Sequence, residues 1–305
     1  MIDTKLITFI TLCETRNYTK TAELLYVTQP SVTNHIKTLE KMYDVRLFTS
    51  HSKNFDLTPQ GELLYKYAMQ LKAYDAQFER LLAASTNQKE LITFSATPNI
   101  KSAFLKHVIT KWTSNREDLN FCLNVDPYNK IMEDLNSGII DFAIIDNNFN
   151  KKKYNSIPLH KTKLFLAVNK KHPLAKNIVI SFDELIKERI ILDISGTGKR
   201  DFLESELKSK NRSIKDLTEV IEINSPDTVI DMVLSSKIAS IFYESEIEDY
   251  IKNGKLIPID ILEVKNDIQF NLIYNKNHLS SKLIEEIAIE FSKIYKENNF
   301  LKYTK

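Results

Sequence analysis

The hydrophobic positions near the N-terminus predict two short helices joined by a tight turn. A first helix over residues 19–26 has an apolar face made of Ala22, Leu24 and Leu25. A second helix has apolar residues four, three and four positions apart, which places them on one stripe: Val32, Ile36, Leu39 and Tyr43. Thr28 suits the N-cap of this second helix, and Pro30 suits its first turn, where a missing N–H costs nothing. The pattern predicts a helix-turn-helix.

The opposite face of the second helix is polar, short-chained and cationic. Such side chains suit base edges and phosphates when a helix enters a DNA groove. We therefore interpret this face as a DNA-reading surface, made of Thr28, Gln29, Pro30, Ser31, Thr33, Asn34, Lys37, Thr38 and Lys41. The alternative is an ordinary amphipathic helix pair whose outer face is only solvated.

The segment that follows predicts a β-hairpin wing. Residues 49–58 (TSHSKNFDLT) are polar, and Lys53 lies near the expected tip. A cation at a wing tip can reach the minor groove or a phosphate, although Lys53 can also be a solvated loop lysine. Residues 1–58 contain seven Lys/Arg and six Asp/Glu, a net charge of only +1. DNA affinity must therefore depend on a few placed cations and on dimerisation.

Residues 59–88 predict a long helix with a coiled-coil pattern. Thr58 suits its N-cap and Pro59 its first position. Its apolar residues step alternately by three and four, which is typical of a coiled coil. The seam consists of Leu64, Tyr67, Leu71, Tyr74, Phe78 and Leu81. We interpret this segment as a dimerisation helix that pairs two DNA-reading modules. Packing against the second domain of its own chain is the alternative.

Residues 1–90 resemble a LysR-type transcriptional regulator. The family's run of motifs has counterparts in Tyr18, residues 21–25 (TAELL), residues 28–33 (TQPSVT), Ile36, Leu39-Glu40, Leu47-Phe48 and residues 57–61 (LTPQG). The chain departs after Phe48, where members usually have an arginine and this chain has Thr49 and Ser50. The resemblance implies a sequence-specific DNA-binding regulator, with an all-α winged helix-turn-helix domain at residues 1–58 and a linker helix at residues 59–88.

From residue 91 onward, apolar strands alternate with helices. The predicted strands cover residues 91–96, 119–125, 139–145, 163–168, 189–194, 217–223, 238–243, 256–260 and 269–274. Helices are predicted at residues 98–112 and 127–135, from Thr197, up to Leu234, and within residues 285–295. The alternation is typical of an α/β domain with covered sheets. The resemblance implies a two-lobed effector domain at residues 89–305, like a type 2 periplasmic binding protein. Lobe I would hold residues 91–161 and 267–305, and lobe II residues 162–266.

In the family that the chain resembles, the cleft between the lobes holds a small effector. Thr97 lies at a strand-to-helix junction, where a hydroxyl and free backbone N–H groups suit a carboxylate. Simple capping of the helix is the alternative, and both can hold together. Other polar residues at strand ends or helix starts complete the candidate effector site: Asn99, Tyr128, Asn129, Asp146, Ser195, Thr197, Asn224 and Ser225.

Two acids bear on the chemistry of the effector. Asp126 and Asp146 follow the second and third strands of this domain and are expected to face the same opening. Together they would repel a simple dianion, so an effector with an amino group, such as an amino acid or an amine, is favoured. Either acid can instead turn to solvent or pair with Lys101 or Lys130.

The sequence does not favour an enzyme. Residues 195–200 resemble half a P-loop, but Asp193 replaces the first glycine and Arg200 the final Ser/Thr. Asp201 also occupies the last glycine position of a GxGxxG motif. The six histidines and two cysteines show no metal-ligand or redox spacing. We therefore expect no catalysis, no cofactor and no metal.

Composition agrees with a multidomain globular protein, with 305 residues of which 43% are hydrophobic and 27% charged. The sequence shows no signal peptide and no apolar run of membrane length, so a cytoplasmic location is expected. The expected partners are double-stranded DNA, a small-molecule effector, and further copies of the chain in a homodimer or homotetramer. The alternative function is a DNA-binding regulator whose α/β domain only oligomerises and binds no effector.

Overall fold

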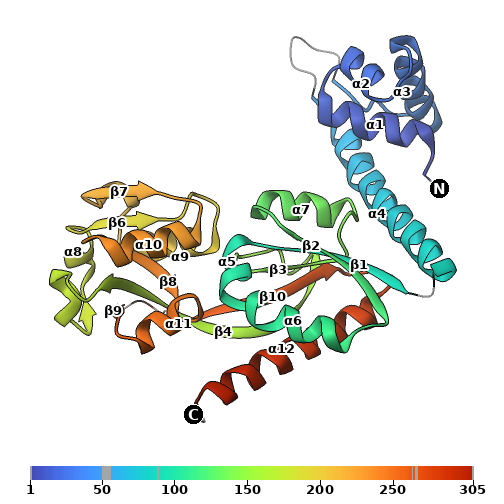
Figure 1. Cartoon of the computed structure of the whole chain (residues 1–305). Coiled ribbons are helices and arrows are strands. Elements are labelled where there is room, and N and C mark those ends of the chain that lie inside the picture. The colour runs from blue at the N-terminus through green and yellow to red at the C-terminus, as the bar shows by residue number, and fades with distance from the viewer. Residues whose placement is uncertain (1, 50–55, 88, 263, 265–266, 304–305) are drawn as a thin grey trace. The chain divides into compact units, whose positions relative to one another are not determined.

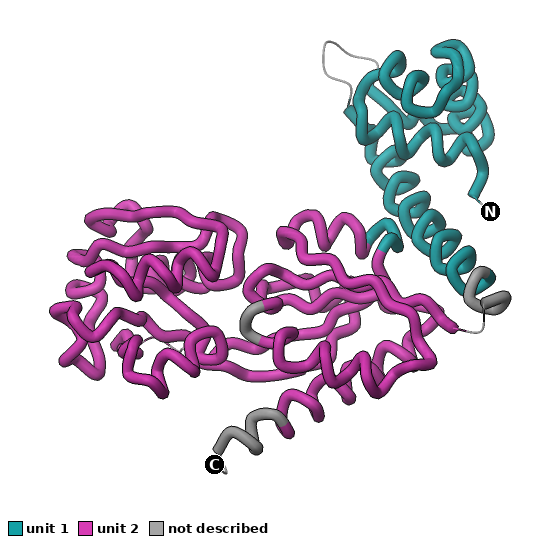
Figure 2. The backbone as a smooth tube through the Cα atoms, viewed as in Figure 1, with its two compact units in different colours: residues 1–88, 136–139 teal, residues 89–135, 140–305 magenta. Residues whose placement is uncertain are grey.

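The computed structural model describes residues 2–49, 56–87, 89–262, 264 and 267–303. The chain divides into two compact units (Figure 2). Unit 1 comprises Met1–Gln88 and Asn136–Ile139, and unit 2 comprises Lys89–Leu135 and Ile140–Lys305.

Unit 1 contains a helix-turn-helix followed by a long helix (Figure 1). Its helices are α1 (Thr4–Thr15), α2 (Tyr18–Leu24), α3 (Gln29–Tyr43) and α4 (Pro59–Asn87). One apolar core joins α1, α2, α3 and the N-terminal half of α4, and the side chains of Phe9, Val32 and Leu47 are fully enclosed in it. The predicted helix-turn-helix and linker helix are confirmed.

Side-chain caps and one close contact explain where α3 and α4 begin. The Thr28 hydroxyl accepts a hydrogen bond from the N–H of Ser31 at 3.3 Å, and the Thr58 hydroxyl accepts one from the N–H of Gly61 at 3.0 Å. A β-carbon on Gly61 would lie 2.2 Å from the carbonyl oxygen of Leu47. Glycine is therefore required where the first turn of α4 packs on the backbone at Leu47.

Two predicted core positions of the helix-turn-helix are wrong. Leu24 is 55% exposed and Tyr43 is 49% exposed, whereas Thr21 and Ala22 are buried on α2. The reason is local: α2 is only seven residues long and ends at Leu24, and α3 ends at Tyr43. Both side chains therefore lie at helix ends, beyond the reach of the core.

The base of the predicted wing is present. Phe48 and Leu57 form an antiparallel bridge, and the N–H of Thr49 donates to the carbonyl of Asp56 at 2.9 Å. Lys53, the cation expected near the tip, lies outside the described residues.

The strands of unit 2 form one mixed sheet path in the order β2-β1-β3-β10-β4-β8-β6-β7 (Figure 1). The strands are β1 (Glu90–Ala96), β2 (Leu119–Val125), β3 (Phe142–Ile145), β4 (Tyr154–Asn169), β5 (Val179–Ile180), β6 (Arg189–Leu192), β7 (Glu219–Glu222), β8 (Ala239–Tyr243), β9 (Leu256–Ile261) and β10 (Asp267–Asn275). β1 is parallel to β2 and β3, and β6 is parallel to β7 and β8. β4 and β10 run antiparallel to their neighbours.

The long strand β4 joins two lobes within unit 2. Its residues up to Lys163 pair with β10, and its residues from Leu164 pair with β8 or β9. We call lobe I the part built on β1, β2, β3, β10 and the first part of β4, and lobe II the part built on β6 to β9 and the end of β4.

Helices pack around both lobes. They are α5 (Pro98–Ile100), which continues through a π-helical turn (Lys101–Leu105) into α6 (Lys106–Asn115), then α7 (Tyr128–Asn136), α8 (Phe182–Leu185), α9 (Gly198–Ser209), α10 (Pro226–Ser235), α11 (Glu244–Lys252) and α12 (Ser281–Tyr303). In lobe I, Phe94 stacks on Phe142 with ring centroids 4.6 Å apart, and Trp112 meets Phe291 edge-on at 5.1 Å. These contacts place an aromatic core between β1, β3, α6 and α12.

Several parts of unit 2 differ from the sequence prediction. The first half of β4 lies outside the predicted strands, and no element is predicted at β5, α8 or α11. The first half of β4 alternates buried and exposed positions and carries lysines and a histidine, which hides its strand character. The sequence of α11 (ESEIEDYIK) is only nine residues long, so its few apolar positions give too short a pattern to distinguish a helix. β3 begins at Phe142 rather than at residue 139.

Candidate DNA-binding face and effector site

The candidate DNA-reading face of α3 is open to solvent. Its exposed members are Thr28, Gln29, Pro30, Asn34, Lys37 and Lys41, and its half-buried members are Ser31, Thr33 and Thr38. The buried stripe of Val32, Ile36 and Leu39 holds the opposite side of the helix in the core. The helix is thus fixed along one side and free along the other.

Side chains on this face differ in whether they already have partners. The Thr33 hydroxyl donates to the carbonyl of Gln29 at 3.1 Å, and the Thr38 hydroxyl donates to the carbonyl of Asn34 at 2.7 Å. Within the described part of the chain, the side chains of Asn34 and Lys37 form no hydrogen bond or ion pair. They are therefore available to bases and phosphates.

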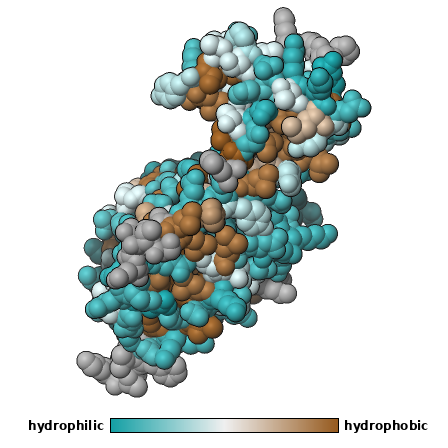
Figure 3. All heavy atoms as spheres, turned by 90° about the vertical axis from the view of Figure 1, so that its right-hand side faces the viewer, coloured by the Kyte–Doolittle hydropathy of each residue, from teal (hydrophilic) through white to brown (hydrophobic). Residues whose placement is uncertain are grey.

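The predicted seam of α4 is divided between two faces. Leu64 and Leu71 are half-buried and pack against the core of unit 1, and Leu81 is also half-buried. The exposed apolar side chains form a neighbouring stripe: Leu63, Tyr67, Tyr74, Phe78 and Leu82. Exposed hydrophobic side chains of unit 1 are visible as brown patches in the upper part of Figure 3. Exposed aromatic residues on a long helix are typical of a surface that pairs with another chain.

Polar side chains of both lobes meet at Asp146, which follows β3. Its carboxylate accepts a hydrogen bond of 2.7 Å from the Thr97 hydroxyl in lobe I and one of 2.6 Å from the Tyr243 hydroxyl in lobe II. The side-chain amide of Asn99 donates to it at 3.4 Å. All four side chains are buried. Of the predicted effector residues, the structure therefore brings together Thr97, Asn99 and Asp146.

Two asparagines of lobe I also reach lobe II. Asn99 Nδ2 donates to the Asp193 carboxylate at 3.1 Å. Asn147 Nδ2 donates to the carbonyl of Gly196 at 3.3 Å and to the Asp201 carboxylate at 3.0 Å. Among the described residues, the buried Oδ1 of Asn147 has no hydrogen-bond partner. We call this set of interlobe contacts, together with those of Asp146, the interlobe seam.

In the described ranges, one buried lysine, Lys199, places its ammonium group against the acids of the seam. Lys199 Nζ lies 3.2 Å from the Glu246 carboxylate and 3.5 Å from that of Asp193. Burial by itself would lower the pKa of Lys199, but Glu246 and Asp193 outweigh it and raise this pKa, so Lys199 is charged. Burial and the nearby Asp146 carboxylate raise the pKa of Tyr243, which keeps its hydroxyl a donor.

The other predicted effector residues are not hydrogen-bonded to Asp146 within the described ranges. The Tyr128 hydroxyl donates to the carbonyl of Asn148 at 3.0 Å, and the Thr197 hydroxyl donates to the carbonyl of Ile194 at 3.0 Å. The remaining four are three exposed residues and one half-buried one, namely Asn129, Ser195, Asn224 and Ser225. The structure thus gathers the predicted residues of lobe I more closely than those of lobe II.

One detail of the expected opening is wrong. The backbone N–H of Thr97 is predicted to be free, but it donates to the carbonyl of Ile144 at 3.3 Å, because β1 and β3 remain paired to their ends. Asp126 lies close enough to Lys130 to help raise the pKa of this lysine, whose hydrogen-bond partner is Asp134.

Several seam residues were not predicted from the sequence. Tyr243, Asp193 and Asn147 each lie at or just after the carboxyl end of a strand, as Asp146 does. Their position at the carboxyl end of a strand is the sequence feature from which they could have been predicted. Tyr243 ends an apolar run and resembles a core residue, and Lys199 follows the predicted residues Ser195 and Thr197 in a segment that also resembles half a P-loop.

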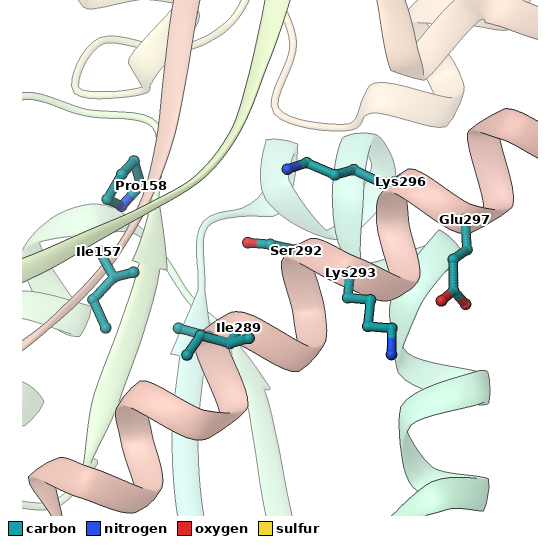
Figure 4. Close-up of a pocket in the computed structure, with 8 residues that line it drawn as sticks. Ile157, Pro158, Ile289, Ser292, Lys293, Lys296 and Glu297 are labelled. Atoms are coloured by element: carbon teal, nitrogen blue, oxygen red, sulfur yellow. The ribbon is translucent and has the colours of Figure 1, made fainter.

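An open apolar groove of about 580 Å³ lies elsewhere in unit 2, between β4 and α12 (Figure 4). Ile157 and Pro158 of β4 face Ile289 of α12, and Lys293 and Lys296 lie along its rim. None of the residues that bond to Asp146 lines this groove. It is therefore distinct from the interlobe seam.

Two other kinds of feature are not found in the described ranges. No group of three or more His, Cys, Asp or Glu side chains there is arranged to hold a metal ion. No described helix combines the length and the apolar character that crossing a bilayer requires.

Similar proteins of known sequence are described as transcriptional regulators. The HTH-type transcriptional regulator CysL of Bacillus subtilis is 27% identical over 301 residues, which cover 97% of this chain and 98% of that protein. An uncharacterized HTH-type transcriptional regulator of Methanocaldococcus jannaschii is 28% identical over 260 residues, covering 84% of this chain and 88% of that protein.

Solved structures share the fold of the whole chain. A full-length OxyR variant from Pseudomonas aeruginosa superposes with a TM-score of 0.62 at 19% identity and covers 95% of this chain and 94% of its own. Full-length CbnR in complex with its target DNA superposes with a TM-score of 0.58 at 15% identity, covering 98% of this chain and 100% of its own.

Family models match both parts of the chain. The model described as a bacterial regulatory helix-turn-helix protein of the lysR family matches residues 4–62. The model described as a LysR substrate binding domain matches residues 85–289. Together with the helix-turn-helix of unit 1 and the two lobes of unit 2, these matches show that the chain belongs to the LysR family of transcriptional regulators.

Proposed function

We propose that this LysR-family regulator reads double-stranded DNA through α3, pairs through α4, and changes its action on DNA when a small molecule binds at the interlobe seam. The observation that carries the proposal is the meeting of buried polar side chains from both lobes at Asp146. Ligands of open α/β sheets bind at the carboxyl ends of the strands, where these side chains lie.

The exposed face of α3 supports the proposal on DNA. Asn34 offers an amide that can pair with a base edge, and Lys37 and Lys41 offer charges for phosphates. Thr28 caps the N-terminal turn of α3. In helix-turn-helix proteins, the N-terminal residues of the second helix contact base edges. Lys53 remains part of this proposal as a contact from the wing.

The exposed stripe on α4 supports the proposal on pairing. Tyr67 is 53% exposed and Phe78 is 51% exposed, which is unfavourable for side chains of this size in a monomer. A second copy related by a two-fold axis would bury both stripes and place two α3 helices on one duplex. A homodimer is the smallest assembly that achieves this, and a homotetramer would repeat it.

An unsatisfied acceptor at the seam supports a ligand that carries an amino group. The donors around Asp146 already bond to its carboxylate, so a free carboxylate would find few donors left. In contrast, Asn147 Oδ1 is buried without a partner in the described part of the chain. Lys199 is paired with Glu246, and the carboxylates of Asp146 and Asp193 also lie beside it. An ammonium or guanidinium group would supply donors and positive charge at once.

The proposed function is tested in two steps. First, wild-type protein is incubated with a pool of random duplexes, and the bound sequences are amplified and compared. A regulator of this kind enriches one sequence, and enrichment of none contradicts the proposal for α3. Second, amines, amino acids and carboxylic acids are screened for stabilisation of unit 2, because a ligand that binds only the folded state raises its melting temperature.

The fluorescence of Trp112 makes the second step specific. Trp112 is the one tryptophan of the chain and is buried in unit 2, so its signal follows the unfolding of that unit. Stabilisation by an amine supports the ligand site. If no member of the screen stabilises the Trp112 transition, the alternative is favoured, in which the α/β domain only oligomerises.

A further inference from the structure

The Asp146 carboxylate lies in a cradle of four residues, three of which donate hydrogen bonds to it. The Thr97 hydroxyl follows β1, the Asn99 amide belongs to α5, the Tyr243 hydroxyl ends β8, and Gly198 begins α9. Hydrogen bonds of 2.7, 3.4 and 2.6 Å join the first three to the carboxylate. We call these four residues the carboxylate cradle.

The backbone of Gly198, at the start of α9, packs directly against the Asp146 carboxylate. A β-carbon on Gly198 would lie 2.4 Å from both Cγ and Oδ2 of Asp146, so only glycine fits there. Gly198 is the first residue of α9, a helix of 12 residues, whose N-terminal end carries partial positive charge. The charged Lys199 follows directly and interacts electrostatically with Asp146.

The cradle has the chemistry of an anion site. The Thr97, Asn99 and Tyr243 side chains face the carboxylate as donors and are themselves buried, so water does not compete for them. Without a carboxylate, the hydroxyls of Thr97 and Tyr243 would lose their acceptor in the interior, which is costly, while the Asn99 amide would keep its hydrogen bond to Asp193. The site therefore favours an anionic acceptor, and in this chain Asp146 itself provides it.

We propose that the carboxylate cradle is an anion-binding site that the protein fills with its own Asp146 side chain, and that Asp146 thereby excludes carboxylate ligands from this part of the seam. The inference deepens the proposed function, because it gives the reason why the ligand of the seam is cationic. Binding of an anion in the cradle can be tested without DNA and without an identified effector.

The proposal predicts that removing the carboxylate opens the site to a small anion of the same size. Asp146→Ala deletes one carboxylate group, so formate matches the space that is left. Asp146→Gly also deletes the β-carbon, so acetate matches that larger space. The Asp146→Asn variant keeps the space filled with a neutral amide and should admit neither anion.

The experiment measures thermal unfolding of the full chain through Trp112 fluorescence in sodium formate, sodium acetate and sodium chloride at matched ionic strength. Asp146→Ala should melt lower than wild type in chloride, and formate should restore at least half of that loss in a saturable manner. Asp146→Gly should respond in the same way to acetate. Wild type and Asp146→Asn should each melt at the same temperature in all three salts.

A matched control separates the cradle from a general effect of losing an acid. Asp201→Ala removes another carboxylate that takes part in interlobe contacts, one that is exposed and bonds to Asn147 rather than to the cradle. Its melting temperature should not respond to formate. Equal formate responses in wild type, Asp201→Ala and Asp146→Ala would overturn the proposal, because they would show a salt effect without a site.

The test of the cradle remains decisive if a variant folds poorly. If Asp146→Ala is unfolded in chloride, its recovery on refolding in formate supports the cradle. If neither Asp146→Ala with formate nor Asp146→Gly with acetate gains any stability or folded protein, the proposal is overturned. Loss of the proposed function would look different, because wild type would then enrich no DNA sequence or bind no amine, whatever the anions do to the variants.

Discussion

The hydroxyl of Tyr243, at the end of β8 in lobe II, donates a hydrogen bond of 2.6 Å to the carboxylate of Asp146, which follows β3 in lobe I. Both side chains are buried, and 97 positions separate them in the sequence. The two lobes are therefore bonded to each other through side chains of the chain itself. A ligand that enters the seam must exchange such bonds for its own, so its binding energy can change how the lobes are held.

Tyr243→Phe should destabilise unit 2. The change removes one hydroxyl and leaves a buried carboxylate with one donor fewer, which should cost about 1–3 kcal/mol of the free energy of unfolding. Urea unfolding followed by Trp112 fluorescence measures this cost. Tyr250→Phe on α11 is the matched control, because among the described residues the Tyr250 hydroxyl has no hydrogen-bond partner. Equal stability of Tyr243→Phe and wild type would contradict the account of the seam.

Asn34→Ala and Lys37→Ala should weaken binding to the selected DNA sequence. Loss of a direct base contact by Asn34 should cost about 1–3 kcal/mol and relax the preference at one base pair. Loss of a phosphate contact by Lys37 should weaken binding to all sequences and reduce its dependence on salt. Titration of labelled DNA at several salt concentrations measures both effects. Lys276→Ala, which removes an exposed lysine from unit 2, serves as control. Wild-type binding by both α3 variants would remove α3 from the DNA interface.

Tyr74→Lys combined with Phe78→Lys should dissociate the proposed dimer. Both side chains are exposed on α4, so the charges should not disturb the core of unit 1 and should act only across a partner. Leu71 is unsuitable for this test because it is half-buried against the core of its own unit. Sedimentation should show a species of half the mass with weaker DNA binding, while Glu79→Lys on the same helix should leave the assembly intact. An unchanged mass for the double variant would show that chains pair elsewhere.

The local structure of unit 1 could be predicted from the sequence because its signals are local. Thr28 and Pro30 fix the start of α3, Thr58 and Pro59 fix the start of α4, and apolar spacing fixes the buried side of α3. The side on which Tyr43 or Leu71 lies could not be predicted. It depends on where neighbouring helices end, which is a tertiary property.

His160 should make the stability of unit 2 depend on pH. Burial, and to a smaller extent the charges of His107 and Lys296, lowers the pKa of His160 to about 4. Its ring lies 4.2 Å from that of Tyr295, measured between centroids. Below about pH 6.5 the unfolded chain takes up a proton that the folded chain accepts only near pH 4. The free energy of unfolding should therefore fall as the pH drops from about 6.5 to about 4.

The size of this effect is measured by comparison with His160→Phe. The wild type should lose roughly 1–2 kcal/mol more than the variant across that interval, less than for a fully buried ring, because His160 is only half-buried. Urea unfolding at several pH values gives the difference. Parallel curves for the two proteins would show that His160 titrates alike in the folded and unfolded chains.

The interlobe seam could be predicted only in part. Thr97, Asn99 and Asp146 follow strands of lobe I, and the rule that ligand sites lie at the carboxyl ends of strands identified them. The pairing of Asp146 with Tyr243 could not be predicted, because it depends on how β4 passes from one lobe to the other. The same rule favoured Ser195 and Asn224, which are exposed in the structure. Position at a strand end therefore identifies candidates but not their partners.

The most direct test of the account is a titration of the selected DNA with full-length protein, with and without an amine that stabilises the Trp112 transition. If the seam is the effector site, that amine should change the affinity for DNA or the length of DNA protected from cleavage. Asn147→Ala removes the unsatisfied acceptor proposed for the amine and should weaken the response to it, while leaving ligand-free DNA binding intact. Unchanged DNA binding at saturating amine, or an undiminished response in Asn147→Ala, would contradict the central claim that ligand binding at the seam controls action on DNA.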